Sequence, residues 1–153
     1  MSPWGQGTAT VDRLLAEGHL ERVPANLEAA QALVDKSRVH LGSAAALADT
    51  DVELAYDALH AANRKALTAV LLAQGLRPTR DGGHVAVYDA VRAQLDPPMG
   101  ATLAPYTRIR RARNLGDYQD ELPNTSDDVR GDLPLCEAIV DVAAKVLGQM
   151  PPY

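Results

Sequence analysis

The apolar residues of the chain recur at near-helical spacing over two long stretches, and this periodicity constrains the fold more than any other feature. The first stretch runs from Leu27 to Ala48 and the second from Ala55 to Ala73. The apolar residues are mostly Ala, Leu and Val, and the chain contains no Phe. Small side chains without Phe favour closely packed helices over a sheet. The sequence therefore predicts an all-α protein.

Turn and capping residues divide the first half of the chain. We expect a short helix from Thr10 to Ala16 that stops at Gly18, and a long helix after Pro24 that runs to Asp49. Thr50 and Glu53 match a capping box, so a second long helix should begin there and end at Gly75. The stretch 76–83 is rich in turn residues and is predicted to be an exposed basic loop.

Prolines mark the helices of the second half. His84 should open a third helix that Asp96-Pro97-Pro98 closes, and Pro105 suits the first turn of a fourth. A short turn capped by Thr125 or Ser126 is expected next, followed by a last helix from Asp132. We therefore predict an antiparallel four- to five-helix bundle over residues 25–148, preceded by an accessory segment (1–24) with a short helix and followed by a tail (149–153).

Composition also bears on disulfides, membrane association and localisation. The single cysteine, Cys136, excludes an internal disulfide and any multi-cysteine metal site. No apolar run approaches the roughly 20 residues of a membrane span, and the N-terminus lacks the features of a signal peptide. We expect a soluble, cytoplasmic protein that does not associate with membranes.

One positive band lies within this acidic chain. Residues 1–75 contain six basic and nine acidic side chains, residues 76–113 seven and three, and residues 114–153 two and eight. The net charges are thus −3, +4 and −6, and four arginines fall between Tyr106 and Tyr118. Such a band can receive phosphate groups, or it can be neutralised by the protein's own acidic surface or by a second copy of the chain.

The helical period gives this arginine segment two faces. At about 100° per residue, one stripe is made of small or apolar residues and is expected to be buried: Pro105, Ile109, Ala112 and Gly116. The opposite stripe is expected to be exposed and to carry the function: Tyr106, Arg110, Arg113, Asn114 and Asp117. The structural alternative is a solvated face on which Arg113 and Asp117 pair at i,i+4.

Other chemistries have no positive support in the sequence. No two of the four histidines have the spacing of a helical zinc site, so neither a metal nor another cofactor is expected. There is no GxSxG motif, and Cys136 lies in an apolar helical run, which indicates a core residue. His84 follows Gly82-Gly83, where it orders a turn or lies beside backbone amides that could bind phosphate.

The segment from Arg113 to Tyr118, Arg-Asn-Leu-Gly-Asp-Tyr, resembles the motif of the HEPN superfamily, in which Arg and a polar residue precede a ring side chain on a late helix of a bundle. Ala55-Tyr56-Asp57-Ala58, the stretch 63–67 and Gly82-Gly83-His84 support the resemblance, which covers roughly residues 25–148 and is closest in character to an actinobacterial-type branch. The family is helical and commonly dimeric, and it includes metal-independent endoribonucleases of toxin, antiphage and RNA-processing systems.

The resemblance implies a site made of Arg113, Asn114 and Tyr118, with Tyr118 at the position of the family's histidine. It also implies that two copies of this helix face one another, so that Arg110 and Arg113 of both chains line one cleft. Together with the positive band, this identifies Arg110, Arg111, Tyr106 and His84 as candidate nucleic-acid-binding residues.

Tyrosine is a poor base near neutral pH, because its reference pKa is about 10. The resemblance therefore implies a homodimer that binds RNA or a nucleotide, and the tyrosine implies that its ribonuclease activity is weak or absent. Two alternatives stay open. One is a regulatory module, such as a toxin–antitoxin partner, whose arginine face binds an acidic protein, and the other is an active endoribonuclease toxin that uses tyrosine in place of histidine.

Overall fold

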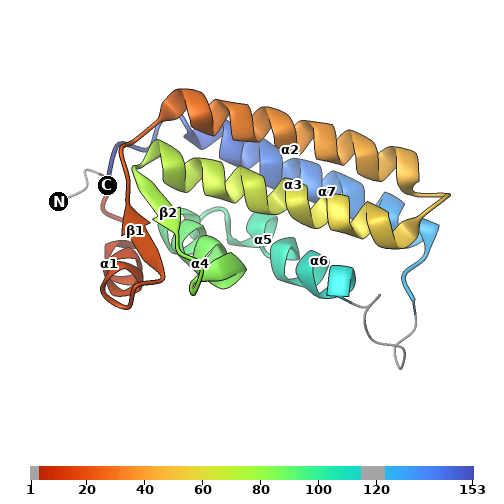
Figure 1. Ribbon diagram of the computed structural model, residues 1–153, viewed down its shortest axis with the longest axis horizontal. Coiled ribbons are helices and arrows are strands. Elements are labelled where there is room, and N and C mark those ends of the chain that lie inside the picture. The colour runs from red at the N-terminus through yellow and green to blue at the C-terminus, as the bar shows by residue number, and fades with distance from the viewer. Residues whose placement is uncertain (1–3, 115–122) are drawn as a thin grey trace.

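The computed structural model describes residues 4–114 and 123–153 and is mostly helical (Figure 1). The helices are α1 (Thr8–Ala16), α2 (Leu27–Leu47), α3 (Val52–Ala73), α4 (Gly83–Leu95), α5 (Gly100–Leu103), α6 (Pro105–Asn114) and α7 (Ser126–Val146). Two short strands, β1 (Leu20–Arg22) and β2 (Leu76–Pro78), form an antiparallel pair. The prediction of a predominantly helical chain is confirmed, whereas the strand pair was not predicted.

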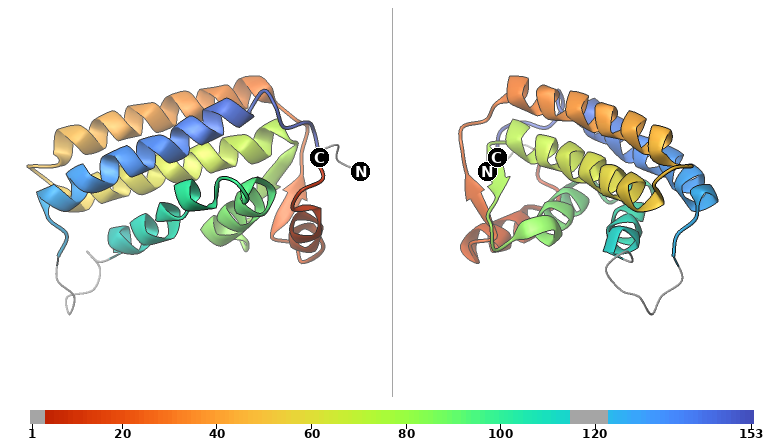
Figure 2. Two further views of the ribbon diagram at one scale, coloured as in Figure 1. Left: turned by 180° about the vertical axis from the view of Figure 1, so that it is seen from behind. Right: turned by 45° about the vertical axis from the view of Figure 1, so that its right-hand side comes forward.

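The three long helices form the body of the molecule, and α3 is its centre. α2, α3 and α7 pack against one another, while α4 and α6 cover another side of α3 (Figures 1 and 2). Small residues such as Ala55, Ala62, Ala66 and Ala69 of α3 are fully buried. They let the neighbouring helices α2, α4, α6 and α7 approach α3 closely.

Several helix boundaries differ from the sequence-based expectation. The N-cap of α3 is Asp51, whose carboxylate accepts the amide of Leu54, and not Thr50. Residues 76–78 were predicted to be loop, but they pair with β1 and bury Leu76.

The start of α7 also differs, because one helix runs from Ser126 and contains Pro134 in its interior. Buried residues continue at helical spacing on both sides of the proline, from Val129 through Cys136 to Val146. The burial of this face offsets the backbone hydrogen bond that proline cannot donate.

Two buried glutamine side chains, at the end of α3 and in α4, form hydrogen bonds with each other. Gln74 Nε2 donates to Oε1 of Gln94 at 2.6 Å, and Gln94 Nε2 donates to Oε1 of Gln74 at 3.1 Å. The indole of Trp4 donates to the backbone carbonyl of Gln94. The backbone amide of Tyr153 donates to the backbone carbonyl of Gln74. Residues assigned to the accessory segment and the tail therefore pack into the same core as α3 and α4.

Gly7 allows α1 to lie directly against α4. It has a φ of 79°, and a Cβ there would lie 2.5 Å from the carbonyl carbon and oxygen of Ala93. Gly7→Ala is expected to lower the free energy of unfolding by about 3 kcal/mol, because it adds a backbone clash to left-handed strain. Urea denaturation measures the change.

Gly18→Ala provides the matched control. Gly18 has a φ of 77°, but no heavy atom of the described residues lies within 4 Å of its added Cβ. This variant should lose only the strain energy, about 1 kcal/mol. Equal losses for the two variants would show that contact with Ala93 is unimportant.

Within the described residues, no helix has both the length and the apolarity to cross a bilayer.

Candidate functional site

The arginine helix α6 buries Tyr106, Ile109 and Ala112. The expected burial of Ile109 and Ala112 is confirmed, but the prediction that Tyr106 lies on the exposed face is wrong, because its side chain is 1% exposed. Its ring stacks on Tyr88, with centroids 5.0 Å apart, and is tilted against His60 at 5.8 Å. Burial raises the pKa of Tyr106 to about 12. A ring packed in this way is part of the core and cannot stack on a base.

The burial of Tyr106 rotates the helix relative to the predicted stripes. Pro105, expected in the buried stripe, is only half-buried. The aromatic ring has more apolar surface to bury than the proline, so the larger side chain turns inward. Gly116 and Asp117, the last members of the two stripes, lie outside the described residues.

Arg108 is held by a carboxylate in the core. Its Nη2 lies 2.5 Å from Oδ1 of Asp132 on α7, and the hydroxyl of Tyr56 on α3 donates to the other oxygen at 2.6 Å. Asp132 and Tyr56 are buried, whereas about half of the Arg108 side chain is exposed. The pKa of Tyr56 is raised, first by burial and then by its bond to Asp132. This trio joins α3, α6 and α7, so the role of Arg108 is structural.

Arg113 is paired across the seam between α6 and α3. Its Nε lies 3.2 Å from Oδ1 of Asp57, and the two side chains are 42% and 48% exposed. The structural alternative paired Arg113 with Asp117, which lies outside the described residues. Because a half-exposed ion pair contributes little stability, Asp57 is a partner that an incoming anion can replace.

Arg110 and Arg111 differ from the other two arginines of α6. Within residues 4–114 and 123–153, no carboxylate lies within 4.0 Å of either guanidinium. Arg111 is exposed and lines an open cavity of about 450 Å³, together with Arg108, Asn124 and the first turns of α7. Among the described residues, Arg110 and Arg111 are therefore the arginines of α6 that lack a carboxylate partner.

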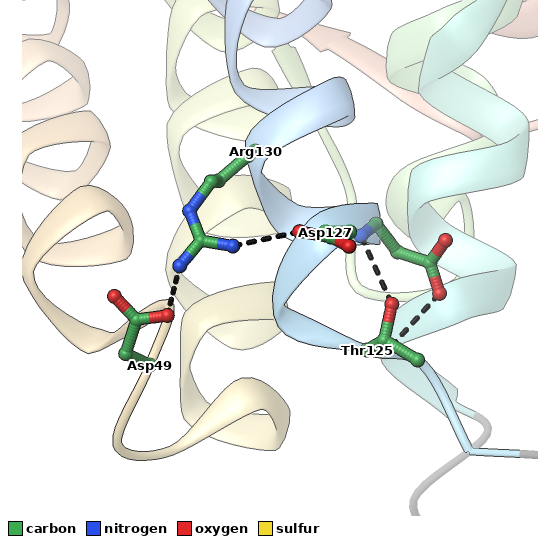
Figure 3. A network of polar contacts seen from close by, with 5 residues as sticks. Asp49, Thr125, Asp127 and Arg130 are labelled. Atoms are coloured by element: carbon green, nitrogen blue, oxygen red, sulfur yellow. Dashed lines mark hydrogen bonds and ion pairs between the residues drawn. The ribbon is translucent and has the colours of Figure 1, made fainter.

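The N-terminus of α7 borders this cavity but already has its own partners (Figure 3). Thr125 accepts the amide of Asp128, and the carboxylate of Asp128 accepts the amide of Thr125. Arg130 bonds to Asp127 and to Asp49 at the end of α2. Two aspartates in the first turn also occupy the positive end of the helix dipole. A phosphate at this cavity would consequently depend on the arginines and not on the helix end.

The remaining predicted site residues are only partly described. Asn114 is half-buried and is the last residue of α6, while Tyr118 lies outside the described residues. His84 belongs to the backbone of α4, but its side chain is not among those described. The structure thus brings Arg110, Arg111, Arg113 and Asn114 together on one helix.

Cys136 lies in the core, as predicted, and accepts a hydrogen bond from Asn63. Burial raises the pKa of its thiol to about 12, so it is protonated at neutral pH and is not a nucleophile. In the part of the chain that the structure describes, no group of three or more His, Cys, Asp or Glu side chains is placed to hold a metal ion.

Sequence reasoning missed Arg64, which α3 places beside the arginine helix. Arg113 faces Asp57 and Tyr106 faces His60, so α6 runs antiparallel to α3 along the seam. Arg64 lies one turn beyond His60, and its positive charge, like that of Arg110, favours the ionised form of Tyr106. Only the three- and four-residue spacing of Asp57, His60 and Arg64 could have indicated a shared helix face.

Comparison with protein-family models, curated proteins and solved structures finds no match to the chain.

Proposed function

We propose that the arginine surface of α6, formed by the half-buried Arg110 and the exposed Arg111 and Arg113, binds RNA or a nucleotide through phosphate groups. The observation that carries the proposal is the difference among the arginines: Arg108 is tied to a buried carboxylate, whereas Arg110 and Arg111 have no carboxylate partner within the described residues. Guanidinium groups bind phosphate oxygens with two parallel hydrogen bonds. Within the described residues these two groups lack a carboxylate partner, and because their mutual repulsion is unfavourable, stability alone does not account for their placement.

We further propose that ribonuclease activity is weak or absent. Cleavage by the 2′-hydroxyl of RNA needs one group that takes its proton, another that protonates the leaving oxygen, and positive charge on the phosphorane. Arg113 can supply the charge, but a guanidinium is not a base. Tyr118 stands where a HEPN-like motif has histidine, and tyrosine titrates too high to act as a base near pH 7.

The resemblance also supports a homodimer in which two copies of α6 border one cleft. In such a dimer the two arginine surfaces would double the positive charge presented to one RNA molecule. Sedimentation of the protein with and without RNA would test this part separately.

Tyr118→His is expected to raise RNA cleavage in the presence of a chelator by about a hundredfold, the usual contribution of a positioned acid or base. The assay incubates purified protein with single-stranded and structured RNA and follows the products on a denaturing gel. Tyr118→Phe is the matched control, because it changes the same side chain without adding an imidazole.

Two results would contradict this account. Metal-independent cleavage by the wild-type protein that Arg113→Ala abolishes would show that the site is already active. If Tyr118→His and Tyr118→Phe both stay inactive, the site lacks more than a base.

A further inference from the structure

Four basic side chains gather where α2 and α3 lie side by side, outside the arginine surface of α6. Lys36 and His40 are one turn apart on α2, and Arg64 and Lys65 are neighbours on α3. His40 Nε2 lies 2.5 Å from Nζ of Lys65. This contact requires a neutral imidazole that accepts a hydrogen bond from the ammonium group. We refer to these four residues as the α2–α3 cluster.

Within the part of the chain that the structure describes, the positive charges of the α2–α3 cluster have no acidic partner. Among the described residues, no carboxylate lies within 4.0 Å of Lys36, Arg64 or Lys65. The pKa of Lys65 is lowered by burial and then by the charges of Arg64 and Lys36, and the pKa of His40 is lowered by burial and by all three cations. A bound anion would relieve this repulsion.

Arg64 connects the α2–α3 cluster to the arginine surface. α3 lies between α2 and α6 (Figure 1), and Arg64 follows His60, which contacts the Tyr106 ring of α6. The charges of Arg64 and Arg110 both act on the hydroxyl of Tyr106. Packed helices are about 8–10 Å apart, so basic side chains extend over roughly 20 Å from α6 across α3 to α2.

We propose that the α2–α3 cluster is a second phosphate-binding subsite, so that the protein binds an extended single strand of RNA across α6, α3 and α2 and not one nucleotide alone. This inference rests on the proposed function of the arginine surface. A mononucleotide is too short to bridge two subsites about 20 Å apart, whereas the backbone of a strand of several nucleotides can follow a row of basic side chains of this length.

The test measures the fluorescence anisotropy of a labelled single-stranded RNA of about twelve nucleotides as a function of salt. Lys36→Ala/Lys65→Ala is expected to weaken RNA binding about tenfold and to lower the slope of log K against log salt by about 1.4, or about 0.7 for each lost phosphate contact. Binding of AMP, measured by calorimetry, should not change.

Arg13→Ala/Lys145→Ala is the matched control. It removes the same charge from exposed positions on α1 and α7 and should leave RNA binding unchanged. Lys36→Glu serves as a second variant, because Lys36 is exposed and this change does not disturb the His40–Lys65 contact. It should also weaken RNA binding.

The outcomes separate the two proposals. If the wild-type protein binds neither RNA nor AMP, the proposed function fails. If it binds AMP but no RNA, only the second subsite is refuted. If it binds RNA and Arg110→Ala/Arg111→Ala weakens that binding, but the cluster variants bind like the control, only the second subsite is refuted. If the cluster variants lose binding to phosphatidylserine vesicles but bind RNA like the wild-type protein, the cluster binds a lipid surface. This result would also refute the second RNA subsite.

Discussion

Arg110→Ala/Arg111→Ala is expected to bind single-stranded RNA about a hundredfold more weakly than the wild-type protein, because each charge-assisted contact to phosphate contributes about 1.5 kcal/mol or more. These two arginines have no carboxylate partner within the described residues, so their charge is available to a ligand and their loss leaves no buried acid behind. Anisotropy at low salt measures the affinity, and thermal unfolding should show little change.

The Arg13→Ala/Lys145→Ala variant again controls for net charge. If it weakens RNA binding as much as the α6 variant does, binding depends on overall charge and no arginine site exists. The salt dependence gives a second criterion, since the α6 variant should lower the slope of log K against log salt by about 0.7 per lost phosphate contact.

Asp132→Ala is expected to lower the free energy of unfolding by about 3 kcal/mol. The variant leaves the buried hydroxyl of Tyr56 without its acceptor and Arg108 without its counter-charge. The bonds that it removes join α7 to α3 and to α6, so the exposed arginines of α6 should also lose their fixed position. Chemical denaturation gives the stability, and RNA binding at a temperature where the variant is folded gives the second effect.

Asp141→Ala is the matched control on the same helix. Asp141 pairs with Arg38, and both side chains are largely exposed, so its loss should cost less than about 1 kcal/mol. Asp132→Asn should fall between the two, because the amide keeps an acceptor for Tyr56 but carries no charge. An Asp132→Ala variant as stable as Asp141→Ala would mean that the Tyr56–Asp132–Arg108 trio contributes nothing.

The sequence was sufficient for features that depend on local signals. The end of α4 at Asp96, before two prolines, follows from the missing amide donor of proline. The end of α3 before Gly75 follows from the positive φ that glycine adopts. The helical period also predicted that Ile109 and Ala112 are buried.

What the sequence could not supply are contacts between residues far apart in the chain. Tyr56 and Asp132 are 76 residues apart, and Arg113 and Asp57 are 56 apart. A helical wheel does not show which helix packs against a given face. It therefore could not predict that the ring of Tyr106 packs against Tyr88 and His60. For the same reason the α2–α3 cluster was hidden in a segment whose net charge is −3.

The Gln74–Gln94 pair has a consequence for the uniqueness of the fold. Each amide is both donor and acceptor to the other, so the pair is satisfied in only one alignment of α4 on α3. If α4 slid by one turn, the two side-chain amides would lose each other, and Gln94 would keep only its bond to the Ala90 carbonyl. Each unmet buried group would cost about 1–3 kcal/mol. Apolar side chains would tolerate such a slide far better. The two glutamines therefore select one helix register from several that the alanine-rich surfaces alone would permit.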